Sequence, residues 1–262
     1  AFTFKDSIKK LDNHNKVLEI TNRAKASLEE GREKGSWGDP KLKILAKNFP
    51  IKNLKYDQSG MTGVEIWVSQ NIPLSSKYKK REEIYRSSSN AYILDSQDMK
   101  NFLAKELWMY LIINREIKEK KQILKENLKW IIENIQVSRK LYSNGKISQQ
   151  AILELEIRKS ELEVRISNKR FELDQVSENV FYLLGYKIDA IDQSTIPWNI
   201  LNKENLNIKD HRELALQKRI TVQDLKIKES KLGLIPDLSL SISATKRAAN
   251  DGAGDFVGAG VS

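Results

Sequence analysis

The sequence predicts a mainly α-helical protein with a minor β part, built around a long antiparallel helical hairpin. Breakers are scarce, with 12 Gly and 5 Pro in 262 residues, and none lies between Pro73 and Gly145. Charged residues make up 31% of the chain. Few breakers together with many Lys, Glu, Leu and Ile favour long helices. Short stretches typical of strands separate these helices.

The first part of the chain predicts one helix and one pair of strands. Residues 12–34 repeat apolar side chains on one helical face. The segment 35–40, with two Gly and one Pro, ends this helix. Two strand-like pieces, 41–49 and 61–72, then make up a first strand pair within residues 41–73.

Residues 76–185 predict the hairpin. A helix that is continuous to about residue 143 would be roughly 100 Å long at about 1.5 Å per residue. Its apolar positions alternate in steps of three and four, interrupted by Asn114 and Lys121, and comprise Leu103, Leu107, Tyr110, Ile117, Leu124, Leu128, Ile131 and Ile135. A second helix with the same spacing ends near Gly185. This spacing predicts coiled-coil packing between the two helices.

The last part predicts a loop segment at 186–210, a helix at 211–233 and a second pair of strands at 236–262. Apolar and small polar residues alternate strictly over 238–245. A membrane barrel strand needs this alternation, with one face toward lipid and one toward water. A half-buried strand of a soluble sheet gives the same alternation, and on this strand alone the soluble interpretation is the favoured one.

An internal repeat shifts the balance toward the membrane interpretation. Residues 14–47 and 211–247 both run from a His near a helix start, through a Gly–Pro breaker, into a strand. The N-terminal residues 1–10 have no apolar core of a signal peptide, and no apolar run of about 18 residues predicts a membrane helix. Without a signal peptide we expect a mature form or a fragment, and because residues 258–262 lie within a strand-like stretch, a truncated chain is the favoured expectation.

Charge and motif content argue against other functions. The net charge is +10, but Lys and Glu interleave, as at 116–121, which indicates helix-surface pairing and no nucleic-acid partner. The chain has no Cys, and His14 and His211 lack partners at ligand spacing, so we predict no metal site and no cofactor. No nucleophile elbow, phosphate loop or paired-His motif occurs, so we predict no enzyme.

Several motifs, in this order and spacing, resemble the TolC-like outer-membrane efflux protein family over nearly the whole chain. They are Gly35-Ser36-Trp37-Gly38-Asp39-Pro40, Met61-Thr62-Gly63, Val68-Ser69-Gln70-Asn71-Ile72-Pro73 and Gly233-Leu234-Ile235-Pro236-Asp237-Leu238-Ser239-Leu240. The chain resembles the N-terminal half of such a protein, and the first two motifs are most similar to the heavy-metal or cation efflux branch.

The resemblance implies the outer-membrane channel of a tripartite efflux system, a passive conduit for small molecules or metal ions. It implies a homotrimer in the outer membrane of a Gram-negative bacterium that extends into the periplasm. The strands would form a shared β-barrel in outer-membrane lipid, and the helices a periplasmic α-barrel. Its partners would be a periplasmic adaptor protein and an inner-membrane pump.

The hairpin tip is the predicted contact with the adaptor. The residues that resemble the family's tip pattern are Arg139, Leu141, Tyr142, Gly145 and Ser148. Gly145 permits a tight turn between helices, Ser148 can cap the second helix, and Arg139 offers several donors to a partner. A well-capped turn without any partner explains Gly145 and Ser148 equally well, but it does not explain Arg139 or Tyr142.

Two alternative functions remain open from the sequence. A periplasmic adaptor also contains a long helical hairpin, but its strands would form a compact module that directly flanks the hairpin. A soluble coiled-coil scaffold would leave the alternating strand at 238–245 unexplained.

Overall fold

The computed structural model describes residues 2–57, 59–199, 210–248 and 254–262. The chain forms two compact units. We call Ala1–Ile20 with Ser96–Lys209 the hairpin unit, and Thr21–Asp95 with Asp210–Ser262 the sheet unit. The long helix α3 (Lys77–Ser143) contributes residues to both units.

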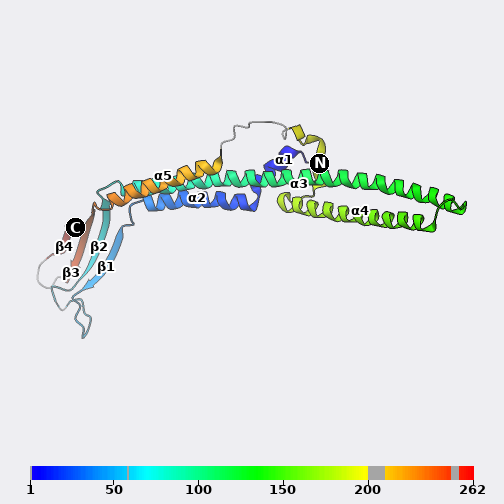
Figure 1. Cartoon of the computed structure of the whole chain (residues 1–262). Helices are drawn as coiled ribbons and strands as arrows, with labels where there is room; N and C mark the ends of the chain where they lie inside the picture. The colour runs from blue at the N-terminus through cyan, green and yellow to red at the C-terminus, as the bar shows by residue number, and fades with distance from the viewer. Residues whose placement is uncertain (1, 58, 200–209, 249–253) are drawn as a thin grey trace. The chain divides into compact units, whose positions relative to one another are not determined.

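The sheet unit contains a four-stranded antiparallel sheet in the order β1-β2-β3-β4 (Figure 1). Its strands are β1 (Lys41–Lys47), β2 (Gly63–Pro73), β3 (Asp237–Arg247) and β4 (Phe256–Val261). The two strand pairs that are distant in sequence join where β2 pairs with β3 along its full length. The predicted class, mainly α with a minor β part, is confirmed.

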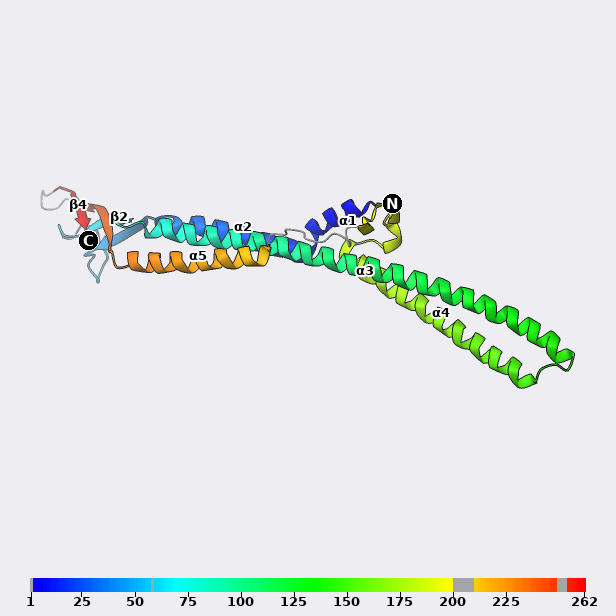
Figure 2. The ribbon, with the colours of Figure 1, turned by 45° about the horizontal axis from the view of Figure 1, so that its top comes forward.

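Helices of the sheet unit pack unusually closely. Both α2 (Asn15–Gly35) and α5 (His211–Leu232) lie along α3 (Figures 1 and 2). A Cβ on Gly31 would lie 2.7 Å from the Cβ of Tyr85, so a side chain there would force the helices apart. Ser89 of α3 donates a hydrogen bond to the carbonyl oxygen of Ala24 at 2.7 Å. Small residues and hydroxyl-to-backbone hydrogen bonds thus replace bulky apolar packing here.

The hairpin unit consists mainly of the distal part of α3 and the antiparallel helix α4 (Gln149–Leu184) (Figure 2). The predicted heptad seam is the buried face: Leu103, Leu107, Ile117 and Ile135 are at most 6% exposed. Asn114 occupies a seam position and is 3% exposed. A polar residue at such a position costs stability and favours one helix register over others.

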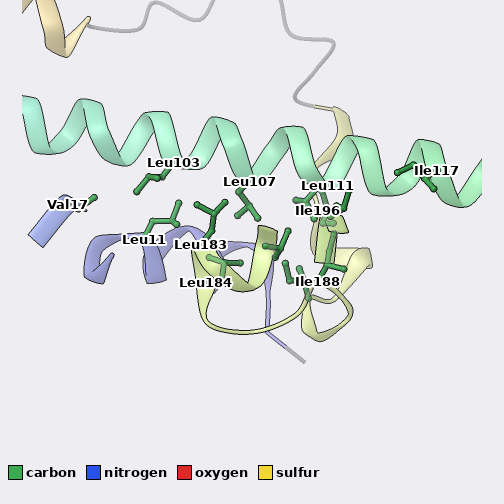
Figure 3. Close-up of a cluster of buried hydrophobic side chains, with 13 residues drawn as sticks. Leu11, Val17, Leu103, Leu107, Leu111, Ile117, Leu183, Leu184, Ile188 and Ile196 are labelled. Carbon is green, nitrogen blue, oxygen red and sulfur yellow. The ribbon is translucent and has the colours of Figure 1, made fainter. Parts of the chain in front are cut away.

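An apolar cluster closes the base of the hairpin (Figure 3). Leu107 of α3 faces Leu183 of α4, Leu111 lies further along α3 beside Ile196, and Leu11 joins the cluster from the N-terminal segment. That segment contains a helix the sequence analysis did not predict, α1 (Phe4–Lys10), which begins with a capping box between Thr3 and Asp6. Ile188, Ile191 and Ile196, which lie in or next to the short 3-10 turns Ile188–Ala190 and Gln193–Thr195, complete the cluster.

Some boundaries differ from the sequence expectations. The first helix begins at Asn15 instead of residue 12, because Leu11–Asn13 forms a 3-10 turn. Strand β1 ends at Lys47, where the positive φ of 57° at Asn48 turns the chain. Residues 200–209 of the expected loop and 249–253 of the second strand pair lie outside the described residues. Among the described helices, none is sufficiently long and apolar to cross a bilayer.

Candidate membrane face and hairpin tip

The sheet places most of its aliphatic side chains on one face and most of its polar and charged side chains on the other. Because directly paired residues share a face, the register assigns each side chain. The apolar face carries Leu42, Ile44, Ala46, Val64, Ile66, Val68, Ile72, Leu238, Leu240, Ile242, Ala244, Val257, Ala259 and Val261. The polar face carries four cations, two carboxylates, serines and glycines, together with Leu45, Trp67 and Phe256, and the apolar face also includes Gln70 and Lys246.

Exposure of the two faces is the reverse of that in a water-soluble sheet. On the apolar face, Ile44 is 68% exposed, Ile242 64% and Val257 80%. On the polar face, Glu65 is only 8% exposed and Ser69 5%. A soluble antiparallel sheet packs its apolar face on a core and leaves the polar face in water. This sheet instead presents its apolar side chains outward, as a strand does when it meets lipid.

The polar face is held together by charged and aromatic contacts. Lys47 forms an ion pair with Glu65, and the hydrogen bond from Lys47 lowers the pKa of the Glu65 carboxyl. Lys43 places its ammonium 4.8 Å from the ring centroid of Trp67, its direct neighbour on β2. Such cation–π contacts hold a lysine without cancelling its charge.

A second set of contacts lies at the two ends of this face. At the end near α3, Lys77 forms an ion pair with Asp237 at 2.8 Å. At the other end, Arg247 donates a hydrogen bond to the carbonyl oxygen of Gly60 at 2.5 Å, and its guanidinium lies 4.7 Å from the centroid of the Phe256 ring. These contacts fix the ends of the polar face.

The hairpin tip is a well-defined helix C-cap. Gly145 has φ 73°, in the left-handed region that favours glycine. The amide of Gly145 donates to the carbonyl oxygen of Tyr142 at 2.8 Å, and the amide of Lys146 donates to that of Leu141 at 2.9 Å. This pair of bonds is the Schellman motif, which satisfies the last carbonyl groups of α3.

The other predicted tip residues have different environments. Arg139 donates to Glu156 of α4 at 2.8 Å, so it joins the two arms of the hairpin, and its side chain remains 65% exposed. Tyr142 is exposed, whereas Leu141 is half-buried. Ser148 sits at the N-cap of α4 with extended backbone, but its hydroxyl forms no capping bond with the described helix. Ser148 is thus the N-cap residue, as the sequence predicts, but without the side-chain hydrogen bond that usually accompanies this position.

The two histidines lie in different units. In the hairpin unit, His14 accepts a hydrogen bond at Nδ1 from the amide of Lys16 at 3.2 Å. In the sheet unit, His211 is the first residue of α5. Within the described residues, no group of three His, Cys, Asp or Glu side chains could hold a metal ion.

Sequence reasoning missed two features of these sites. The first is the charged character of the polar face in β1, although Lys41, Lys43 and Lys47 alternate there with apolar residues and gave a usable signal. The second is the aromatic contact of Trp108 with Trp198, at 5.8 Å between ring centroids, in the hairpin base. That pair joins residues far apart in sequence, so no local pattern could reveal it.

Several solved outer-membrane proteins have a fold similar to that of this chain. The chain is similar to the outer membrane protein VceC of Vibrio cholerae, with 12% identity and a TM-score of 0.71. It is also similar to the CmeC outer membrane channel of Campylobacter jejuni, with 13% identity and a TM-score of 0.69, and to CusC, with 12% identity and a TM-score of 0.76.

These alignments cover 98% of this chain in each case. The chain spans 67% of VceC, 60% of CmeC and 64% of CusC. Neither a protein-family model nor a curated protein sequence matches this chain significantly. The resemblance seen in the sequence motifs is confirmed at the level of architecture: this chain has the fold of the TolC-like outer-membrane channels.

Proposed function

We propose that this chain forms part of the outer-membrane channel of a tripartite efflux system, a passive conduit for small molecules or metal ions. In this proposal three copies contribute their strands to one β-barrel, and their hairpins form a periplasmic α-barrel. The protein would act without catalysis, cofactor or resident metal. Its partners would be a periplasmic adaptor and an inner-membrane pump.

The single observation that carries this proposal is the reversed exposure of the sheet. An exposed face rich in Leu, Ile and Val is unfavourable in water, at roughly 25 cal/mol for each Å² of apolar surface. The same face is favourable against lipid tails, and a contiguous apolar patch of this kind marks a membrane or protein contact. The likeness to solved outer-membrane channels supports lipid as that contact.

The two edge strands of the sheet support the proposal that strands of other chains complete it into a closed barrel. In the described sheet, β1 pairs only with β2, and β4 only with β3, so each has one edge without a strand partner. Strand edges in a membrane must be paired, because the hydrocarbon offers no water to their amide and carbonyl groups. A barrel built from several sheets satisfies both edges at once.

The two alternative functions, a periplasmic adaptor and a coiled-coil scaffold, explain fewer features of the sheet. In a periplasmic adaptor the strands would form a water-soluble module, and its apolar face would be buried. In a coiled-coil scaffold the hairpin alone would suffice, and the two-faced sheet would have no role. Neither alternative explains why Ile44 and Ile242 are exposed while Glu65 and Ser69 are covered.

We also propose that the hairpin tip contacts the adaptor through Arg139, Leu141, Tyr142, Gly145 and Ser148. The exposed ring of Tyr142 and the exposed guanidinium of Arg139 support this role. Gly145 and Ser148 would act by shaping the turn. Leu141 would act through its half-buried side chain at the last turn of α3.

The test is membrane fractionation of the full-length protein expressed with a signal peptide. We expect it in the outer-membrane fraction, and we expect detergent to extract a trimer that migrates intact until it is heated. Covalent cross-linking in intact cells checks that the trimer exists before extraction. Recovery as a soluble periplasmic monomer would contradict the channel proposal.

A further inference from the structure

We propose that the polar face of the sheet makes the conduit selective for anions over cations. This inference rests on the proposed channel function, because it requires that the polar face lines a water-filled lumen. It adds a preferred class of transported solute, namely small anionic molecules. The argument depends on which charges the register places on that face and on what surrounds them.

Cations outnumber carboxylates on the polar face of the described strands. The cations are Lys41, Lys43, Lys47 and Arg247, and the carboxylates are Glu65 and Asp237. Each carboxylate is already engaged by a lysine, Glu65 by Lys47 and Asp237 by Lys77. Lys47 is in turn neutralised by Glu65, and the amide of Arg247 donates a hydrogen bond to the Asp255 carboxylate, so Lys41 and Lys43 carry the remaining positive charge of this face.

Residues paired across the four strands form rows, and these rows show where along the strands the positive charge lies. In one row Lys43 is followed across the sheet by Trp67, Ser243 and Gly258. In the next row Lys41 is followed by Ser69, Ser241 and Gly260. In both rows the lysine is the one charged residue, and its neighbours are neutral.

The apolar face shows that lysines are not simply frequent throughout the sheet. Among the described strand residues, the one charged side chain of the apolar face is Lys246, next to the end of β3. Within the described strands, lysine therefore lies in the middle rows of paired residues only on the polar face. There Lys43 is held by the Trp67 ring, which keeps its charge in place.

Rings of charged side chains around a water-filled pore select permeating ions by the sign of their charge. Three copies around one axis would repeat Lys41 and Lys43 as two rings of positive charge. The Debye length is about 10 Å at 0.1 M salt and about 3 Å at 1 M. Selectivity should therefore be strong in dilute salt and weak in concentrated salt. Positive rings disfavour bare metal cations, the cargo that the cation efflux branch would imply.

The experiment measures reversal potentials of the purified full-length trimer in planar lipid bilayers under a KCl gradient. We expect wild-type channels to reverse near the chloride equilibrium potential in dilute salt, and to lose most of this preference in concentrated salt. The variant Lys41→Gln/Lys43→Gln should shift the reversal potential toward that of potassium, with at least a several-fold fall in the chloride-to-potassium permeability ratio. The control Lys246→Gln removes a charge from the other face of the same sheet and should leave the ratio unchanged.

The possible results distinguish a failure of the anion selectivity from a failure of the proposed channel function. Channels that conduct but prefer potassium would overturn the anion selectivity and leave the conduit intact. An anion preference that persists in the double variant would overturn the role of Lys41 and Lys43. A correctly assembled trimer that conducts no ions would contradict the channel function itself, and the selectivity with it.

Discussion

Arg139 combines an internal contact with an exposed surface, and this raises a question about its role. Its guanidinium pairs with Glu156 at 2.8 Å, while the two side chains remain 65% and 40% exposed. An exposed ion pair of this kind contributes only about 0.2–1 kcal/mol to stability. The pair therefore holds the tip weakly, and most of the Arg139 surface is available to a partner.

We predict that Arg139→Glu weakens efflux without preventing trimer formation. The substitution places two carboxylates together at the tip and removes the donors that, in the proposed contact, the adaptor would bind. Efflux-dependent resistance in cells that carry the adaptor and pump gives the readout. Melting of the trimer band in gels should change little, because the lost ion pair is weak.

The matched control exchanges the two charges. Arg139→Glu combined with Glu156→Arg restores an ion pair across the hairpin but moves the guanidinium to α4. If the adaptor binds Arg139, resistance stays low in this double variant. Full recovery of resistance would show instead that the pair only holds the two arms together, and the proposed contact would be wrong.

Individual residues of the tip were predictable to different degrees. The left-handed conformation of Gly145 followed from its place between two helical patterns, since few other residues tolerate positive φ. The ion partner of Arg139 did not follow, because Glu156 is one of several acidic residues on α4. Side-chain partners across a hairpin depend on register, which is fixed only when both helices are packed.

At the scale of elements, the two faces of β1 provide an internal comparison. Ile44 and Leu45 are adjacent and apolar, yet Ile44 lies on the apolar face opposite Ile66, and Leu45 lies on the polar face opposite Glu65. Both side chains are exposed, at 68% and 41%. In a soluble protein, replacing either one by lysine would change stability by only about 0.5 kcal/mol.

We predict that Ile44→Lys strongly reduces the amount of assembled protein, whereas Leu45→Lys does not. A lysine facing lipid costs about 2–4 kcal/mol near the bilayer centre and less near its surfaces. A lysine at position 45 would face water and could pair with Glu65. The measurement is the amount of heat-sensitive trimer recovered from outer membranes. Equal recovery of both variants would contradict the assignment of the faces.

Helices were easier to predict than the sheet for a physical reason. The seam through Leu103, Leu107 and Ile117 is a local pattern, and the same spacing fixes both the helix and its buried face. Strand pairing is not local: β2 meets β3 across more than one hundred and fifty intervening residues. The alternation in β3 is therefore compatible with both a membrane strand and a half-buried strand of a soluble sheet. The pairing of β3 with β2 and β4, together with the exposure of Leu240 and Ile242, distinguishes the two.

At the scale of the whole molecule, the internal repeat organises the sheet unit. The repeat pairs α2 and β1 with α5 and β3, so each copy contributes a helix that runs along α3 and a strand that follows it. The copies share little sequence, but both need a helix end and a breaker before their strand. The order of these breakers was the strongest signal of the fold in the sequence. Helix α1 and the hairpin base were missed because they have no counterpart in the repeat.

The outward-facing isoleucine and valine side chains also determine how this protein must be handled. In aqueous buffer, the sheets of separate molecules would stack through these surfaces, and the open strand edges would add further contacts. Overproduction in the cytoplasm should therefore yield inclusion bodies, and dilution from urea should give a soluble product only when micelles are present. Adding a mild surfactant at the first step of purification is the simplest remedy.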